Sequence, residues 1–527
     1  MPMSIDVIVI GSGFGGAITA CRLAEKGAKV LILERGRRWQ PEDYPRELTD
    51  PWLYDPQEPQ KRNGWADFRY FGDMSVVTGA GVGGGSLIYA NVSVEAKPWL
   101  FNKGWPGEIT YQELKPYYDR VGKMLNLQTV PDNQLTKRFH LMKEAAEKSG
   151  HGDRFHKVPV AVTFDENWNP NLEDPFNDRH SRKFVNDQGQ QQGTCVHCGN
   201  CPIGCQVKAK NTLDLNYIPW AEKHGAEVRP LHLVRYIKPE NGGYRVHFDR
   251  IADGKLVPGS EYARRVIVAA GSIGSTELLL HCRDEFKSLP GISPFLGKNW
   301  SSNGDFLTPG TYKDRVISPT VGVTITCAID FLDEDDTKPQ FFIEEGGGPN
   351  VLKTLLESTK GRSPKLRLAQ LALKELEELR GSGDPFSNVM PWFAQGIDAA
   401  NGRLHLGRPW YAFWRKKRLQ LDWEIDRSKR VIEAIIEMHK ELSVATGGVA
   451  KAPVTWTLLK SLTTPHPLGG CNMGTNAANG VVDHRGEVFG YPNLFVADGA
   501  IVPEAIGLNP SRTIGALAER IATLIDN

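Results

Sequence analysis

The first thirty-five residues show two strand-like apolar runs separated by a helix-like segment. Ile5 to Ile10 is an apolar, β-branched stretch that ends at a glycine turn, which is typical of a buried strand. A helix is predicted from this turn to about Glu25, with Lys26-Gly27 as its exit. A second strand is predicted over Lys29 to Leu33. The order strand, helix, strand predicts a βαβ unit.

The turn before the helix has the spacing G-x-G-x-x-G, at Gly11, Gly13 and Gly16. The first glycine permits the tight turn, the second lets the backbone approach a pyrophosphate, and the third lets helix and strand pack closely. Glu34, after the second strand, is placed to accept both hydroxyls of an adenosine ribose. This order of features disfavours an unrelated glycine-rich loop and predicts a dinucleotide site, without choosing between NAD and FAD.

Two further glycine-rich stretches extend the pattern along the chain. Thr78 to Val92 (TGAGVGGGSLIYANV) allows the backbone to lie against a cofactor. Val266 to Leu280 (VIVAAGSIGSTELLL) predicts a buried strand, a Gly-Ser turn and a helix, and NLFVADGAIVP near the C-terminus predicts another strand. We therefore expect an α/β fold whose nucleotide-binding domain is assembled from separated segments.

The segments between these motifs suit a second domain. Residues 37–71 are loop-like and rich in aromatic side chains, as in a lid over an apolar substrate or an ordinary domain contact. Residues 351–379 predict helices with charged faces, and residues 402–424 predict a hairpin. The hairpin loop places aromatic residues beside the basic run Arg415 to Arg418, which suits either peripheral membrane contact or a plain basic tip.

Composition and charge narrow the function classes. Of 527 residues, 24% are charged and 40% are hydrophobic, as in a globular chain with two joined domains. A net charge of +1 gives no field that would recruit nucleic acid. The N-terminus lacks the basic region of a secretory leader, and no apolar run reaches about 18 residues. Outside one run the cysteines are scattered, so we expect a cytoplasmic protein.

That run is CVHCGNCPIGC, in which Cys195, Cys198, Cys201 and Cys205 have the spacing C-x2-C-x2-C-x3-C. Such short steps can bring thiolates together around an iron–sulfur cluster, and because there is no second run, all four are expected at one site. A 4Fe–4S cluster on four cysteines is preferred to a 3Fe–4S cluster on three. The alternatives are zinc, which favours two separated C-x-x-C pairs, and cysteines that are unmetallated or disulfide-linked.

Five motifs resemble, in their order, those of the glucose-methanol-choline (GMC) oxidoreductase family, and within it the cholesterol-oxidase-like branch. They are GSGFGG at the N-terminus, GAGVGGGSL at 79–87, AAGSIGSTELLL at 269–280, HPLGGCNMG at 466–474 and VADGAIVPEAIGLNPSRTIGALAER at 496–520. Agreement is much weaker in 95–190 and 290–460. The resemblance implies a Rossmann-like FAD-binding domain, a substrate domain with an antiparallel sheet, and alcohol or sterol oxidation by hydride transfer to flavin.

The resemblance also implies which residues contact FAD. Gly11, Ser12, Gly13, Gly15 and Glu34, with Gly16 beside them, hold the ADP half; Gly85, Ser86, Tyr89, Ala90 and Asn91 lie along the flavin; Val234, Ala270 and Gly271 flank the adenine and ribose; Asp498 and Pro510 approach the flavin end. Here L-I-Y-A-N-V replaces the L-V-N-G-G-M usual in sterol oxidases of this branch. Residues 79–97 contain no histidine or cysteine, so the FAD is expected to be non-covalent.

Oxidation of an alcohol by hydride loss requires that the hydroxyl proton leave as well. Histidine suits this task because its pKa lies near neutral pH, and His466 in TTPHPLGGC is the candidate base rather than a merely hydrogen-bonded loop histidine. Asn509 in GLNPSRT is the candidate donor to the substrate oxygen. By resemblance, Glu344 in FFIEEGGGP is a third candidate, with Glu345 on the opposite face; the alternative is a surface carboxylate.

The domain boundaries follow from the motifs. We expect an FAD-binding domain over 1–95, 190–290 and 461–527, and a substrate domain over 96–189 and 291–460. The predicted enzyme is an FAD-dependent dehydrogenase that oxidises an apolar alcohol, a sterol or other cyclic alcohol, to a carbonyl compound. Its electrons would pass through the iron–sulfur cluster to an external acceptor protein.

The cluster prediction has a family precedent and several rivals. Some sugar dehydrogenases of the GMC family carry a cysteine-ligated cluster before an A-K motif like Ala209-Lys210, although with different cysteine spacing. The rivals are an oxygen-using cholesterol or alcohol oxidase with a structural cysteine loop, and a polyol or sugar dehydrogenase. A redox-sensing or electron-transfer protein is a further rival, which His466 and Asn509 disfavour.

Overall fold

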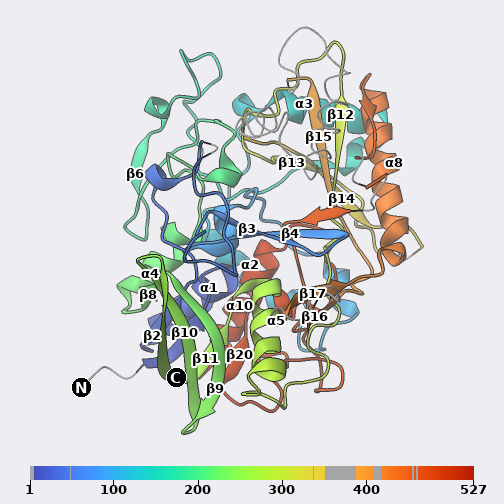
Figure 1. The fold of residues 1–527 in the computed structure, drawn as a ribbon. Helices are drawn as coiled ribbons and strands as arrows, with labels where there is room; N and C mark the ends of the chain where they lie inside the picture. Colours follow the sequence, from blue (N-terminus) through green and yellow to red (C-terminus); the bar gives the residue numbers. More distant parts are fainter. Residues whose placement is uncertain are drawn as a thin grey trace.

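The computed structural model describes residues 5–47, 49–335, 337–349, 387–408, 417–453, 456–457 and 461–526. Figure 1 shows one large sheet in the lower part of the molecule, a second in the upper part, and a small sheet between them. The lower sheet is built from segments that lie within 1–95, 190–290 and 461–527, and the upper sheet from segments within 96–189 and 291–460. Widely separated parts of the chain therefore meet in each sheet.

The lower sheet has seven strands in the order β8-β2-β1-β11-β10-β9, with β20 paired to β11. These strands are β1 (Ile5–Ile10), β2 (Val30–Leu33), β8 (Glu227–Arg229), β9 (His232–Glu240), β10 (Gly243–Ala252), β11 (Lys255–Val268) and β20 (Leu494–Val496). The pairs β1–β2, β1–β11, β2–β8 and β11–β20 are parallel, while β9, β10 and β11 pair antiparallel. Every residue of β2 is buried, which accounts for its uninterrupted apolar run.

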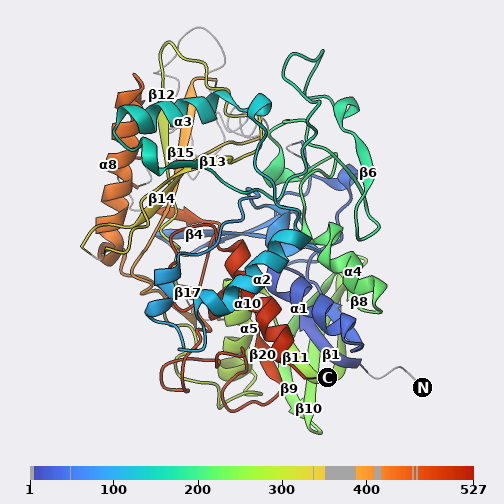
Figure 2. The same cartoon turned by 180° about the vertical axis from the view of Figure 1, so that it is seen from behind.

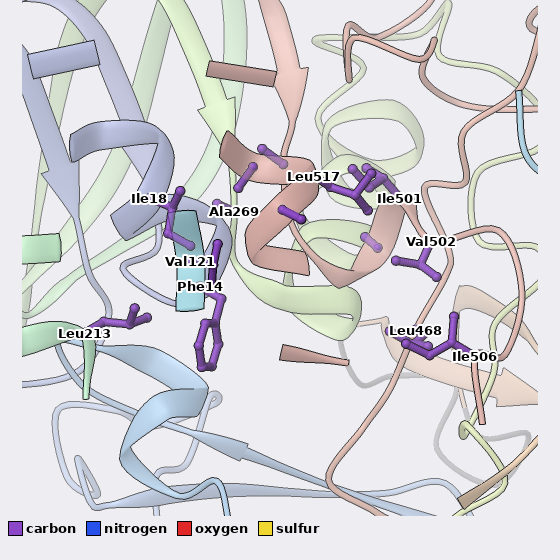
Figure 3. Packing of buried hydrophobic residues seen from close by; sticks show 14 of the residues in the cluster. Phe14, Ile18, Val121, Leu213, Ala269, Leu468, Ile501, Val502, Ile506 and Leu517 are labelled. Carbon is purple, nitrogen blue, oxygen red and sulfur yellow. The ribbon is translucent and has the colours of Figure 1, made fainter. Parts of the chain in front are cut away.

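Three helices pack together beside this sheet: α1 (Phe14–Glu25), α2 (Tyr111–Met124) and α10 (Ser511–Leu524), with α4 (Tyr217–Lys223) against α1 (Figure 2). Figure 3 shows Ile18 of α1, Val121 of α2 and Leu517 of α10 in one buried cluster. A Cβ atom at Gly515 would lie 3.1 Å from Val121 Cγ2 and 3.2 Å from Ile18 Cδ1. Glycine therefore lets α10 approach the other two helices closely.

The upper sheet has six antiparallel strands in the order β18-β12-β15-β14-β13-β5. They are β5 (Phe155–Lys157), β12 (Phe306–Thr311), β13 (Cys327–Asp330), β14 (Phe341–Glu345), β15 (Val389–Gly396) and β18 (Val449–Ala450). Helices α3 (Lys137–Lys148) and α8 (Lys429–Ala445) pack on it. Helix α8 buries Val431, Ile435 and Leu442, which recur at helical spacing and form its sheet-facing stripe.

The small middle sheet consists of β3 (Ala66–Tyr70), β4 (Met74–Gly79) and β19 (Leu462–Thr464). Strand β19 runs parallel to β4, so the carboxyl ends of both strands lie at one edge. Two-stranded ribbons, β6 (Lys183–Val185) with β7 (Gln191–Gly193) and β16 (Arg403–Gly407) with β17 (Arg418–Asp422), complete the described strands. The parallel pairing brings the glycine-rich turn after β4 close to the loop that follows β19.

The structure confirms the α/β fold class and the βαβ unit. Helix α1 ends at Glu25 as predicted, while β2 begins at Val30, one residue later than predicted, because the Lys29 N–H donates to the Asp6 side chain rather than to a backbone carbonyl. Residues 37–71, predicted as a loop, contain β3, because their C-terminal part pairs with β4. The predicted hairpin over 402–424 is confirmed as β16 and β17. Its aromatic loop and the predicted helices over 351–379 lie outside the described residues.

None of the helices in the described part of the chain is both long enough and apolar enough to cross a bilayer.

Candidate active site

A cavity of about 910 Å³ lies between the two large sheets. One wall contains the carboxyl ends of β1 and β2, at Ile10 and Leu33, and Ala269, which follows β11. The opposite wall comes from the upper sheet, including Leu307 of β12 and Phe393 of β15. Ligands of doubly wound folds bind at such strand ends, so the cavity is the candidate site.

The three glycines of the first turn have different surroundings. Gly11 has φ +97°, and a Cβ there would lie 2.4 Å from the Ala269 carbonyl oxygen. A Cβ at Gly16 would lie 2.0 Å from the Gly11 carbonyl oxygen. At Gly13 the nearest atom to a Cβ would be 3.9 Å away, and this residue lines the cavity. Gly11 and Gly16 therefore serve the close packing of turn, helix and strand, while Gly13 leaves room in the cavity.

Glu34 is buried at the cavity edge and is held by the first turn. One carboxylate oxygen accepts hydrogen bonds from the Ser12 N–H at 3.1 Å and the Ser12 hydroxyl at 2.7 Å. The other accepts from the Gly36 N–H at 2.9 Å. The side chain is thereby fixed, while its remaining lone pairs can still accept from a ligand.

Most residues that the sequence assigned to the cofactor line this cavity. They are Gly11, Ser12, Gly13, Gly15, Glu34, Gly85, Tyr89, Ala90, Val234, Ala270, Gly271, Asp498 and Pro510. Gly16, Ser86 and Asn91 do not line it. The Ser86 hydroxyl instead donates to the Gly83 carbonyl and accepts from the Leu213 N–H, so it holds the glycine-rich turn in place.

Asn91 and Asp498 each carry a structural signal of the site. Asn91 is fully buried in the left-handed region, φ 72°, and neither side-chain amide atom has a hydrogen-bond partner within the described residues. Such unpaired buried groups are uncommon and are often satisfied by an ordered water. Asp498 accepts from the Gly271 N–H at 2.8 Å and from the Ser275 hydroxyl at 2.5 Å. It thereby ties the start of α5 (Gly271–Leu280) to the segment after β20.

His466 lies in the loop after β19 and lines the cavity. Its Nδ1 is 2.9 Å from Oδ1 of Asp305, whose side chain is fully buried. Burial alone would lower the pKa of His466, but the Asp305 carboxylate, and beyond it Glu344, outweigh burial and raise that pKa above its usual value. The imidazole therefore has a buried carboxylate partner, and its role as the base stays a prediction.

Glu344 and Asn509 are in contact beside this histidine. The Asn509 amide donates to Oε2 of Glu344 at 3.3 Å, and the Gln395 amide donates to the same oxygen at 2.9 Å. Burial raises the pKa of Glu344 to about 7, although these two hydrogen bonds act to lower it. Asn509 lines the cavity, whereas Glu344 stands behind it, and the surface-carboxylate alternative is wrong because Glu344 has no exposed surface.

Sequence reasoning missed two polar residues at this centre, Asp305 and Gln395. Asp305 follows an Asn-Gly pair just before β12, and Gln395 lies on the mostly apolar β15. Neither belongs to a recognisable motif. The only available signal was a polar residue inside an otherwise apolar stretch, which often marks a buried partner of another polar group.

The aromatic segment 37–71 contributes less to the cavity than a lid would. Trp39 and Trp65 form a small buried cluster with Leu87. Pro56 and Gln57 line the cavity. Part of the segment therefore lines the cavity and part is buried in the hydrophobic core. That it acts as a lid stays a prediction.

The cysteine run lies beside the cavity, although its metal prediction finds no support in the structure. None of Cys195, Cys198, Cys201 and Cys205 is in a disulfide bond, so the disulfide alternative is wrong. No three metal-binding side chains of the described residues are grouped as ligands of an ion, so neither zinc nor an iron–sulfur cluster is indicated by the side-chain arrangement. Pro202, inside the run, lines the cavity.

Lys210 joins this loop to the glycine-rich turn. It is fully buried, and its ammonium donates to the Leu87 carbonyl at 2.8 Å and the Cys201 carbonyl at 2.7 Å. It also lies 4.8 Å from the centre of the Tyr89 ring, which lines the cavity. Burial lowers the pKa of Lys210 to about 8. The loop and the cavity wall are thus rigidly connected.

Comparisons with known proteins agree on one family. The family model described as GMC oxidoreductase matches residues 415–518, and that of an NAD(P)-binding Rossmann-like domain matches residues 9–39. The chain is 31% identical to a cholesterol oxidase of Acinetobacter baumannii, over 99% of this chain and 94% of that protein. It is also 31% identical to a cholesterol oxidase of Mycobacterium tuberculosis, over 100% of this chain and 92% of that one. Among solved structures, a pyridoxine 4-oxidase from Mesorbium loti has a TM-score of 0.61 at 16% identity and covers 99% of both chains.

Proposed function

Because the chain belongs to the GMC oxidoreductase family, as an FAD-dependent enzyme acting on CH–OH donors, we propose that it oxidises an apolar alcohol, sterol-like or cyclic, to a carbonyl compound. The observation that carries this proposal is the convergence of His466 and Asn509 on the wall of one large cavity. The dinucleotide turn of β1 and α1 lines the same cavity. A proton acceptor and a hydrogen-bond donor thus face the space where a cofactor and an alcohol would meet.

The residues around the cavity fit FAD. Gly13 and Gly85 both line the cavity and leave open space where a side chain would stand. We assign the ADP half to the turn around Gly13 with Glu34, and the flavin to the stretch from Gly85 to Asn91. Bound flavin would accept the hydride lost from the carbinol carbon.

The protein's own residues would handle the proton and the oxygen. Loss of hydride and of the hydroxyl proton together converts CH–OH into C=O. His466 would take the hydroxyl proton on Nε2, because Nδ1 is engaged with Asp305. Asn509 would donate its amide to the substrate oxygen, and Glu344 would set the orientation of that amide.

Support for an apolar substrate comes from the wall near His466. Leu307, Ile325, Pro391 and Phe393 line it, and the relatives at 31% identity are called cholesterol oxidases. A polyol or sugar would leave its hydroxyls beside apolar side chains, so a polyol or sugar dehydrogenase is the weaker candidate. We place the reaction in the cytoplasm and keep peripheral membrane contact at 409–416 as a prediction outside the described residues.

For the electron acceptor we keep the proposal of an iron–sulfur cluster on Cys195, Cys198, Cys201 and Cys205, with an oxygen-using oxidase as the alternative. Support comes from the cysteine spacing and from backbone N–H groups aimed at sulfur: His197 N–H at 3.3 Å from Cys195 Sγ and Ala209 N–H at 3.2 Å from Cys205 Sγ. A cluster would supply one-electron transfer to an external acceptor protein. Iron and sulfide analysis of anaerobically purified protein decides between the two readings.

The substrate test is anaerobic flavin reduction with a panel of cholesterol, cyclohexanol, dodecanol and glucose. We expect bleaching of the flavin absorbance by cholesterol or cyclohexanol but not by glucose. His466→Ala should retain FAD and lower the rate of reduction by about 10²- to 10⁴-fold, the usual contribution of a general base. Reduction of this variant at the wild-type rate would contradict the proposed mechanism.

A further inference from the structure

We propose that Asp305 is a positioning residue that holds His466 as the tautomer with hydrogen on Nδ1 and a bare Nε2. The inference rests on the proposed function, because it concerns the base of the alcohol oxidation. It starts from the 2.9 Å contact between Asp305 Oδ1 and His466 Nδ1. A carboxylate can only accept, so Nδ1 must carry the hydrogen and Nε2 is left as the free acceptor.

The contact is part of a closed set of hydrogen bonds. The second Asp305 oxygen accepts from the Thr464 hydroxyl at 2.5 Å, and the Thr464 oxygen accepts from the His466 N–H at 2.9 Å. Asp305 thereby contacts the imidazole of His466 directly and the backbone N–H of His466 through the Thr464 hydroxyl. This arrangement fixes both the ring and the loop that carries it.

Asp305 is itself held by a rigid turn. Asp398 accepts from the Ser301 hydroxyl at 2.8 Å and from the Ser302 N–H at 2.9 Å. Gly304 has φ +64°, and a Cβ there would lie 2.4 Å from the Gly396 carbonyl oxygen. The backbone just before Asp305 therefore has little freedom to move.

The same turn also anchors the other catalytic candidate. The Asn303 side chain accepts from the N–H groups of Ile506 and Gly507, at 3.0 and 2.9 Å, and donates to the Leu508 carbonyl at 2.9 Å. Asn509 follows directly. One buried turn thus sets the spacing between the base and the oxygen donor, which is what efficient proton transfer requires.

The Nε2 atom of His466 is available for substrate. It has no hydrogen-bond partner among the described residues, and the side chain lines the cavity with 16% of its surface exposed. The charged groups that face the ring are Asp305, next to β12, and Glu344 on β14; Phe393 of β15 and Thr464 of β19 are its uncharged neighbours. Removal of the Asp305 charge should therefore make the imidazole a weaker base.

The test compares Asp305→Asn with wild type and with Asp483→Asn, a turn aspartate that does not line the cavity. The carboxamide of D305N can keep its oxygen toward Thr464 and turn its NH₂ toward Nδ1, which would move the hydrogen to Nε2. We expect D305N to retain FAD and to lose at least about tenfold in kcat/KM with the panel alcohol that reduces wild type. The acid limb of the pH profile of kcat/KM should move to lower pH in D305N, while D483N keeps the wild-type pH profile.

Nitrogen-15 NMR of the histidine side chains reads the tautomer without any substrate, with His466 assigned by the signal missing in His466→Gln. We expect Nδ1–H in wild type and Nε2–H in D305N; the same tautomer and acid limb in both would overturn the inference. Asp305→Glu keeps the carboxylate, so the acid limb of its pH profile should stay at the wild-type pH. This variant replaces D305N in the comparison if D305N loses FAD. If His466→Ala reduces flavin normally, the proposed function fails, and the tautomer still decides the role of Asp305.

Discussion

Two adjacent carboxylates of β14 have opposite surroundings, and this decides their chemistry. Glu344 accepts from the Asn509 amide next to the cavity, whereas Glu345 lies 3.3 Å from the Arg138 guanidinium on the other face. Both side chains are fully buried. Burial raises the pKa of both carboxyl groups; the Arg138 guanidinium opposes this rise at Glu345, whereas Glu344 has only neutral amides in direct contact. Burial therefore dominates at Glu344 and raises its pKa to about 7.

Glu344→Gln should make the protein more stable at high pH. Between its ordinary pKa of 4.5 and about 7, folded Glu344 keeps a proton that the unfolded chain releases. The wild type therefore loses stability as pH rises through this window, by up to about 3 kcal/mol. We expect the free energy of unfolding of E344Q to match wild type near pH 5 and to exceed it at pH 8, as measured by urea denaturation.

Glu345→Gln is the matched control. It leaves the buried Arg138 guanidinium without its carboxylate, so E345Q should be destabilised at pH 8 by about 3 kcal/mol, opposite in sign to E344Q. If E344Q were instead destabilised equally at both pH values, Glu344 would be ionised throughout, and its assignment as a protonated partner near neutral pH would be wrong.

At the scale of elements, the glycine-rich turn between β1 and α1 combines a folding role with a binding role. Its spacing was readable from the sequence because strand, turn and helix are contiguous. The position of Ser86 relative to the cavity could not be predicted, because it depends on how the turn after β4 packs against Leu213, far along the chain. Local patterns predicted the elements, and long-range contacts decided which side chains reach the cavity.

Gly13→Ala and Gly16→Ala should separate the two roles. A Cβ at Gly16 meets backbone at 2.0 Å, so G16A should destabilise the apoprotein by about 1–3 kcal/mol or more. A Cβ at Gly13 meets nothing closer than 3.9 Å, so G13A should unfold like wild type without FAD but bind FAD more weakly. Thermal unfolding of the apoproteins and FAD titration test this; equal FAD affinity of G13A and wild type would remove Gly13 from the cofactor site.

At the scale of the whole molecule, the candidate catalytic centre joins the upper sheet to the middle sheet. Asp305 precedes β12 of the upper sheet, while His466 follows β19 of the middle sheet, and 161 residues separate them. No sequence pattern could pair them, since the contact exists only once β12 and β19 lie side by side. His466, Asn509 and Glu344 could be proposed from the sequence because each belongs to a motif; Asp305 and Gln395 belong to none and were missed.

Most buried apolar side chains of the described residues belong to one large cluster, which runs from Val7 in β1 to Ile343 in β14 and Ile525 at the C-terminal end. A core shared by both sheets should unfold cooperatively even though the chain suggests two domains. We therefore expect a single calorimetric transition for the apoprotein. FAD in the cavity between the sheets should move that whole transition to higher temperature. At a free FAD concentration one hundred times its Kd, the free energy of unfolding should rise by about 2.7 kcal/mol. The control is Gly13→Ala at the same FAD concentration, whose transition should shift less. Two transitions, of which FAD moves only one, would mean that the sheets fold independently and that the cavity wall from the upper sheet does not contribute to cofactor binding.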